Sequence, residues 1–214
     1  MSREAAASKL EPSTAERILE AAEAEFAAVG YAPARLADIA ARAGIRRPSL
    51  LYHFASKELL YRAVVERAFD ELGAELIGSM RLATGFEGRL DALIAGFAAF
   101  LELRPGLAPI IVRELIDDPK HDADASRRGG GHGRTIMLER VAPLLDMVEA
   151  FIRDGGSALL RPKLPIRAAV VQIAGDLLLR RAAGSLRTPL WGPGEHARML
   201  ARIVLFRDPT LHCP

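Results

Sequence analysis

Apolar residues recur every three or four positions along most of the chain, a spacing that predicts amphipathic helices. The first helix is expected to begin at Ser13 or Thr14, either of which suits a cap, and to end at Gly30. Two short helices are expected next, at residues 35–42 and 47–53, and a long helix follows them. No convincing alternation typical of strands appears, so the pattern predicts an all-α fold of about nine helices.

Gly44 interrupts the helical pattern between the two short predicted helices. Glycine permits the positive φ that a sharp turn between helices requires. The residues around it suit the close packing of two helices, because Ala40 is small and Ile45 and Leu50 are aliphatic. A small residue, a glycine and two aliphatic residues at this spacing predict a helix-turn-helix over about residues 34–53.

The charge of the chain is unevenly distributed. The 214 residues carry a net charge of only +2, and half of them are apolar, as in an ordinary folded protein. Residues 33–62 hold six basic and two acidic side chains, whereas residues 1–32 hold three basic and six acidic ones. A solvated face gives the same pattern, so the charge alone does not identify a nucleic-acid partner.

The segment after Gly44 carries side chains that suit a DNA duplex. Arg46 and Arg47 stand at the start of the second short helix, and arginine binds guanine bidentately or pairs with phosphate. Pro48 is tolerated in a first helical turn, and Ser49 is short enough to let the helix approach the groove. Each residue alone has an ordinary explanation as a surface or packing residue, but together, behind such a turn, they favour DNA binding.

Three segments of the sequence have the order and spacing of a known domain: ILEAAEAEFAAVGY, LADIAARAGI and SLLYHFASKELL. The segment from about Thr14 to Leu60 resembles the DNA-binding domain of the TetR (tetracycline-repressor) family of bacterial transcriptional regulators. The rest of the chain is similar to that family only in the number and lengths of its helices. The resemblance implies a DNA-binding domain at residues 12–60 and a helical ligand-binding and dimerisation domain at residues 61–214.

The chain departs from the family at two positions near the helix-turn-helix. Ala34 stands where a capping threonine is common, and Leu51 stands where a tyrosine is frequent. The resemblance implies that residues 46–49 contact bases and that Tyr52, His53 and Lys57 contact phosphates. Arg35 would supply the phosphate contact of the missing threonine. The expected DNA-contacting residues are Arg35, Arg46, Arg47, Pro48, Ser49, Tyr52, His53 and Lys57.

The resemblance also implies a homodimer that binds a near-palindromic operator and a small-molecule effector. The last two long helices would form the dimer. One of these predicted helices, IRAAVVQIAGDLLLRRAAG, fits that role because apolar residues cover most of its circumference. An ordinary core helix has the same pattern. Polar or adaptable residues on apolar helices are the candidates for the effector pocket: Arg113, Met137, Gln172 and Asp176.

Several other classes of site and protein are disfavoured. A single cysteine, Cys213, allows neither an internal disulfide nor a CxxC site. The polar, glycine-rich linker DPKHDADASRRGGGHG lacks the spacing of metal ligands and of a phosphate loop, so no metal and no cofactor is expected. No signal peptide and no apolar run long enough to span a bilayer is present, so we expect a bacterial cytoplasmic protein without membrane contact.

The function predicted from these features is that of a sequence-specific transcriptional regulator, a repressor released by its effector. Two other classes remain as alternatives. An all-α enzyme with the helix-turn-helix used only for packing would need an ordered catalytic set, and none is found, so no catalytic residue is assigned. A helical adaptor that binds proteins would leave Arg46 and Arg47 unexplained.

Overall fold

The computed structural model describes residues 12–116, 132–194 and 196–207, and most of them lie in helices. Within these ranges the structure contains ten α-helices and no strand, apart from an isolated antiparallel bridge between Leu160 and Phe206. The helices are α1 (Thr14–Val29), α2 (Leu36–Arg42), α3 (Arg47–His53), α4 (Lys57–Leu82), α5 (Gly85–Leu103), α6 (Leu107–Ile116), α7 (His132–Gly156), α8 (Ile166–Ala182), α9 (Arg187–Trp191) and α10 (Ala197–Leu205), with a short 3₁₀ helix at Gly184–Leu186. The all-α prediction is confirmed, with one helix more than the expected nine.

Local sequence sets both ends of α1. The backbone N–H of Glu16 donates to Ser13 Oγ at 3.2 Å, and the N–H of Ser13 donates to Glu16 Oε2 at 2.6 Å, which is the predicted capping box. Gly30 ends the helix with φ at +85°, a conformation that glycine adopts without steric cost. The predicted first helix is therefore confirmed at both ends.

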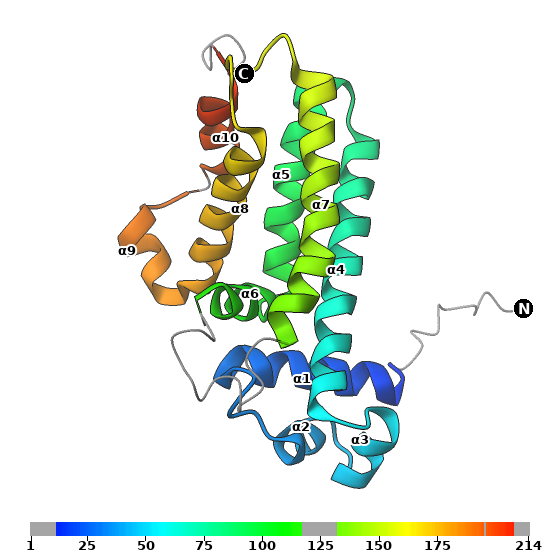
Figure 1. Ribbon diagram of the computed structural model, residues 1–214. Coiled ribbons are helices and arrows are strands. Elements are labelled where there is room, and N and C mark those ends of the chain that lie inside the picture. The colour runs from blue at the N-terminus through cyan, green and yellow to red at the C-terminus, as the bar shows by residue number, and fades with distance from the viewer. Residues whose placement is uncertain (1–11, 117–131, 195, 208–214) are drawn as a thin grey trace, which may run out of the picture.

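The long helix α4 joins the two predicted domains. It begins at Lys57, beside α3, and continues to Leu82, packing along its length against both α5 and α7 (Figure 1). Its buried face includes Leu60, Val64 and Leu72, and each such side chain contributes about 1.5–3 kcal/mol when it is fully buried. Because α4 crosses the predicted boundary at residue 60 without a break, a displacement of its C-terminal half reaches the helix-turn-helix directly.

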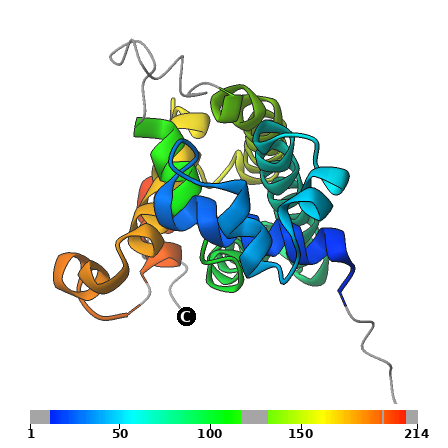
Figure 2. The ribbon, with the colours of Figure 1, turned by 90° about the horizontal axis from the view of Figure 1, so that it is seen from below.

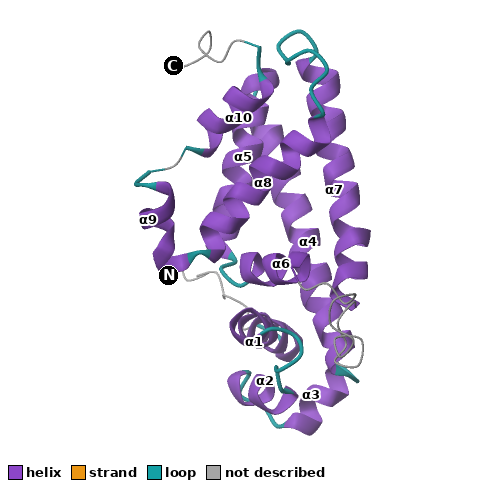
Figure 3. Cartoon of the chain, turned by 60° about the vertical axis from the view of Figure 1, so that its left-hand side comes forward, coloured by secondary structure: helices purple, strands orange, loops and turns teal. Residues whose placement is uncertain are grey.

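Helices α4, α7, α8 and α10 pack against α5. In Figure 1, α6 lies across the lower end of the bundle, next to α1, and α8 and α10 run beside α5. Seen from below, α1–α3 lie across this lower end of the molecule (Figure 2). The short α9 stands apart from the bundle (Figure 3). No single helix in the described ranges is long and apolar enough to cross a membrane. Helices α5 and α6 reach the necessary length and hydropathy only when they are taken together, and the angle between them is 99°.

Candidate nucleic-acid interface

The turn between α2 and α3 is closed by backbone hydrogen bonds. The N–H of Ile45 donates to the carbonyl of Ala40 at 3.0 Å, and the N–H of Gly44 donates to the carbonyl of Ala41 at 3.1 Å. This pair of bonds is the Schellman motif, which places its glycine in the left-handed region, and φ of Gly44 is +71°. Ala40 and Leu50 are buried, and Ile45 is half-buried against the core. Together with the Gly44 turn, these three side chains hold α3 at a fixed angle to α2.

Helix α3 presents its polar side chains to solvent at the lower end of the molecule (Figure 1). Leu50 faces the core and is fully buried, whereas Tyr52 is 88% exposed, which excludes a packing role for this tyrosine. Together with Arg35, just before α2, the exposed residues form what we call the reading surface: Arg35, Arg46, Arg47, Pro48, Ser49, Tyr52 and His53.

The cations of the reading surface are not neutralised within the protein. Among the described residues, the side chains of Arg35, Arg46 and Arg47 take part in no hydrogen bond or ion pair, and all three are exposed. The Tyr52 ring lies edge to face with the ring of His53, with the ring centroids 5.6 Å apart. Unpaired guanidinium groups beside exposed hydroxyl and imidazole groups are the donors that phosphate oxygens and base edges accept from.

Lys57 differs from the other predicted DNA contacts. Its Nζ donates to the carbonyl oxygens of Ala32 and Ala34, at 2.9 and 3.0 Å, and lies 4.6 Å from the centroid of the Tyr31 ring. Partial burial lowers the pKa of Lys57 below its usual range. In this structure the ammonium group therefore holds the loop between α1 and α2, and a phosphate contact by Lys57 stays a prediction.

The missing threonine before α2 has the expected structural consequence. Arg35 occupies the N-cap position, and no side chain accepts a hydrogen bond from the first backbone N–H groups of α2. Ala34 is buried, and its carbonyl accepts from Lys57 instead. The start of α2 is thus fixed by tertiary contact and not by a capping side chain.

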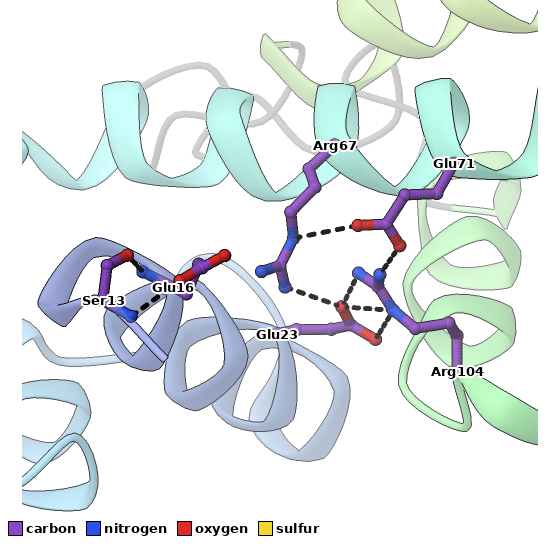
Figure 4. Close-up of polar contacts among 6 residues, drawn as sticks. All are labelled: Ser13, Glu16, Glu23, Arg67, Glu71 and Arg104. Carbon is purple, nitrogen blue, oxygen red and sulfur yellow. Dashed lines mark hydrogen bonds and ion pairs between the residues drawn. The ribbon is translucent and has the colours of Figure 1, made fainter. Parts of the chain in front are cut away.

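A cluster of four charged residues connects α1 to the C-terminal helices, and we call it the seam network: Glu23, Arg67, Glu71 and Arg104 (Figure 4). Arg104, at the end of α5, bonds Glu23 through Nε at 3.1–3.2 Å and also contacts Glu71. Arg67, on α4, lies 3.7 Å from Glu23 and 3.8 Å from Glu71. The Glu23 side chain is only 10% exposed, so this interaction is largely shielded from water.

A second set of contacts connects α6 to the same domain. The Arg113 guanidinium donates to the carbonyls of Phe26, Ala27 and Ala28 at 2.8–3.1 Å. These carbonyls belong to the last turn of α1, where that of Phe26 also accepts from the backbone N–H of Gly30 at 2.9 Å, and α1 has no basic residue of its own there. The Tyr61 hydroxyl donates to Glu114 at 2.5 Å. Sequence reasoning missed both contacts, because nothing near Arg113 indicates a partner 87 residues away.

The predicted effector-pocket residues do not come together. Arg113 lies at the α1–α6 contact and Gln172 is exposed on α8, so a pocket role for either residue stays a prediction. Asp176 accepts from Arg180 and from Trp191, and the side chain of Met137 lies outside the described residues. The cavity that the structure contains in the C-terminal part, about 470 Å³, lies instead between α5, α8 and α10.

Metal chemistry finds no support among the residues that the structure describes. No group of three histidine, cysteine, aspartate or glutamate side chains in these ranges is arranged to hold an ion. The predicted linker between α6 and α7 lies outside the described residues, except that α7 begins at His132.

The described residues thus form an N-terminal helix-turn-helix with an exposed basic helix, followed by a helical bundle. Residues 18–64 match the family model described as "Bacterial regulatory proteins, tetR family". The match covers the helix-turn-helix and the start of α4, so this N-terminal part of the chain is similar to the DNA-binding domain of these transcriptional regulators.

Relatives with known descriptions agree with this assignment. The chain is 38% identical over 86 residues to the HTH-type transcriptional activator FasR of Mycolicibacterium smegmatis, a match that covers 40% of this chain and 39% of the relative. The fatty acid degradation regulator FadR from Bacillus halodurans has the same fold, with a TM-score of 0.68 and 19% identity over 92% of this chain and 94% of that one. The SmeT–triclosan complex gives a TM-score of 0.61 and 24% identity over 94% and 95% of the two chains.

Proposed function

We propose that this protein is a one-component regulator that acts in the bacterial cytoplasm, binds a near-palindromic operator as a homodimer and releases it when a small molecule binds the C-terminal domain. The observation that carries the proposal is the reading surface, where three exposed arginines without a partner among the described residues lie at the starts of α2 and α3, which the Gly44 turn joins. Guanidinium groups that face water contribute little to the stability of the fold. The phosphate oxygens and base edges of a DNA duplex supply acceptors for their hydrogen bonds.

Dimerisation is supported by an apolar face that no other part of the described chain covers. Ala168, Val171, Gly175 and Leu179 follow one side of α8 at helical spacing, and Val171 and Leu179 are each about half exposed. On α10, Met199 and Ile203 are exposed in the same way. A second copy packed on this face would bury it and set two reading surfaces on one two-fold axis, spaced for consecutive major grooves.

Effector control follows from linkage. A small molecule weakens DNA binding only if it prefers the conformation that does not fit the operator, and DNA must then weaken the binding of that molecule equally. Helix α4, the seam network and the Arg113 contact are the structural connections through which such a preference would act. Coupling of about 1–3 kcal/mol, or roughly 5–150-fold in affinity, is typical.

The test is fluorescence anisotropy with labelled duplexes from the region upstream of the protein's own gene, against scrambled duplexes, at two salt concentrations. We expect discrimination of about a thousandfold or more. Arg47→Ala should cost about 1–3 kcal/mol and relax the preference at one base position. The matched control is Arg81→Ala, since Arg81 is also exposed and has no partner among the described residues, but lies at the far end of α4.

Three outcomes would contradict the proposal or its parts. No binding at low salt would make the reading surface an ordinary solvated face. Binding that is weak, equal for all duplexes and abolished by salt would contradict sequence-specific recognition of this region. If the Val171→Glu variant sediments like the wild type in analytical ultracentrifugation, the proposed dimer face is contradicted. Transcription from the operator, measured with and without the protein, decides between repression and activation.

A further inference from the structure

The cavity between α5, α8 and α10 has the size and the apolar wall of a small-molecule site. Its volume of about 470 Å³ falls within the range of roughly 300–1,000 Å³ that such sites occupy. Ile94, Ala98 and Leu101 line it from α5 and Leu177 lines it from α8. The alanine leaves room beside the larger aliphatic side chains, so an aliphatic group fits against this wall.

The polar part of the same cavity is strongly basic. Four arginines line it, at positions 180, 181, 187 and 198, against one acid, Glu102. Arg181 and Arg187 both approach this carboxylate, at 3.1 and 3.3 Å. Arg198 is exposed and takes part in no hydrogen bond or ion pair with another described residue. The field at this end of the cavity is therefore positive.

Arg180 is positioned by its neighbours. It is only 5% exposed, and its Nε donates to Asp176 at 2.7 Å. The indole of Trp191 donates to the same carboxylate at 2.9 Å and lies 5.7 Å from the Arg180 guanidinium. The Asp176 carboxylate balances the charge of Arg180, and Glu102 faces both Arg181 and Arg187. Arg198 is therefore the guanidinium group best placed to meet a ligand.

An apolar wall next to guanidinium groups selects for one ligand chemistry. A neutral apolar molecule would remove these groups from water without giving them an acceptor, which is unfavourable. A guanidinium fork bonds carboxylate and phosphate oxygens with two parallel hydrogen bonds. We propose that this cavity binds an amphipathic anion, an aliphatic chain that ends in a carboxylate or a phosphate monoester.

This inference rests on the proposed function, because it names the chemical class of the effector. It is compatible with the dimer in that proposal. Leu177, Arg180 and Arg181 lie on the opposite side of α8 from Ala168, Val171, Gly175 and Leu179, given 3.6 residues per turn. The anion and a second copy of the chain would thus use different faces of the same helix.

Trp191 makes the proposal directly measurable. It is the single tryptophan in the sequence, so the intrinsic fluorescence of the full chain reports on the edge of this cavity. The protein is titrated with decanoate and decyl phosphate, which share the chain and differ in the head group. Decan-1-ol and decyltrimethylammonium serve as the neutral and cationic controls. All concentrations are kept below those at which these molecules form micelles.

We expect a saturable change with one or both anions and binding of decan-1-ol that is at least about tenfold weaker. Arg198→Gln should weaken anion binding by about tenfold, and Arg81→Gln, which removes an exposed charge elsewhere, should leave it unchanged. Ala98→Phe should block all aliphatic ligands by filling the cavity. Circular dichroism establishes that each variant is folded, and Arg198→Gln still tests the proposal if Ala98→Phe does not fold.

The proposal is overturned if neither anion binds saturably, if decan-1-ol binds as tightly as the anions, or if Arg198→Gln and Arg81→Gln behave alike. Anisotropy of labelled operator in the same samples separates this result from the fate of the proposed function. Saturable anion binding without loss of DNA affinity supports the site and contradicts effector control. Specific DNA binding with no anion binding overturns the site and leaves DNA recognition intact.

Discussion

The reading surface and the seam network are two clusters of charged residues, the first within the helix-turn-helix and the second between α1, α4 and α5, and they are built in opposite ways. Arg46 and Arg47 in the first are exposed and have no partner among the described residues. Arg67 and Arg104 in the second are about four-fifths buried and lie against Glu23 and Glu71. The first cluster carries net positive charge, whereas the second is neutral as a whole.

The difference follows from the environment of each cluster. A charge removed from water must be paired, or it costs several kcal/mol, so the seam network contains as many acids as bases. A charge left in water needs no partner, and its attraction to phosphate is then available for binding. Buried charge in this protein fixes the relative position of α1, α4 and α5, and exposed charge is left for an external polyanion.

The largest effect on stability is expected from breaking the seam network. Arg104→Met would leave the Glu23 carboxylate, only 10% exposed, with Arg67 at 3.7 Å as its nearest cation. We expect the free energy of unfolding in urea to fall by about 3 kcal/mol, because removal of one partner leaves a charge that is poorly solvated. Arg81→Met, at an exposed position, is the control. An unchanged urea midpoint would show that water compensates for the loss.

Gly44→Val tests whether the reading surface depends on the turn. An added Cβ at Gly44 meets no atom within 4 Å, so the expected cost comes from the backbone, which has φ at +71°. We expect a loss of about 2 kcal/mol and at least a tenfold loss of operator affinity, measured by urea unfolding and anisotropy. Gly44→Asn should behave almost like wild type, since asparagine tolerates this conformation. Full DNA binding by the valine variant would refute the role of the turn.

Lys57→Met distinguishes the two roles of a residue that lies between the clusters. Loss of its hydrogen bonds to Ala32 and Ala34 should lower the stability by about 1 kcal/mol. If Lys57 also contacts a phosphate, the slope of log affinity against log salt should fall by about one as well. A lower melting temperature with an unchanged salt slope would assign Lys57 to the loop alone.

The smallest effect is expected at the start of α1, where Ser13 lowers the pKa of Glu16 below its usual 4.5. A carboxylate with a depressed pKa in the folded state adds stability above pH 4.5, and this contribution is lost as the pH falls through the lower, folded-state value. Glu16→Gln should therefore make the stability less dependent on pH in that acidic window. Equal slopes for wild type and variant in urea unfolding would contradict the capping role of the carboxylate.

Local features of this protein could be predicted because a few neighbouring residues determine them. The bounds of α3 agree with the prediction, and Ser56 caps α4 by accepting from the N–H of Leu59 at 3.2 Å. The Gly44 turn requires only the residues from Ala40 to Ile45. Extra short helices after α8 were missed, because a five-residue helix such as α9 has too few positions to show a period.

The partners of the long polar side chains could not be predicted in the same way. Lys57 reaches back 25 residues to Ala32, and Arg104 reaches 81 residues to Glu23. Either side chain is equally acceptable on an exposed surface, so sequence gives no reason to choose a partner for it. The choice of pocket residues has the same weakness and stays a prediction, since a polar residue on an apolar helix does not indicate what lies opposite it.

By itself the sequence therefore determined the longer helices, the caps of α1 and α4 and the turn that presents α3, since these depend on hydrogen bonds and φ preferences within a few residues. The tertiary structure decided which arginines are neutralised and which are left exposed, and where the basic cavity lies. Pairing and solvation depend on the packing of helices that are distant in sequence, and only the folded chain brings those helices together.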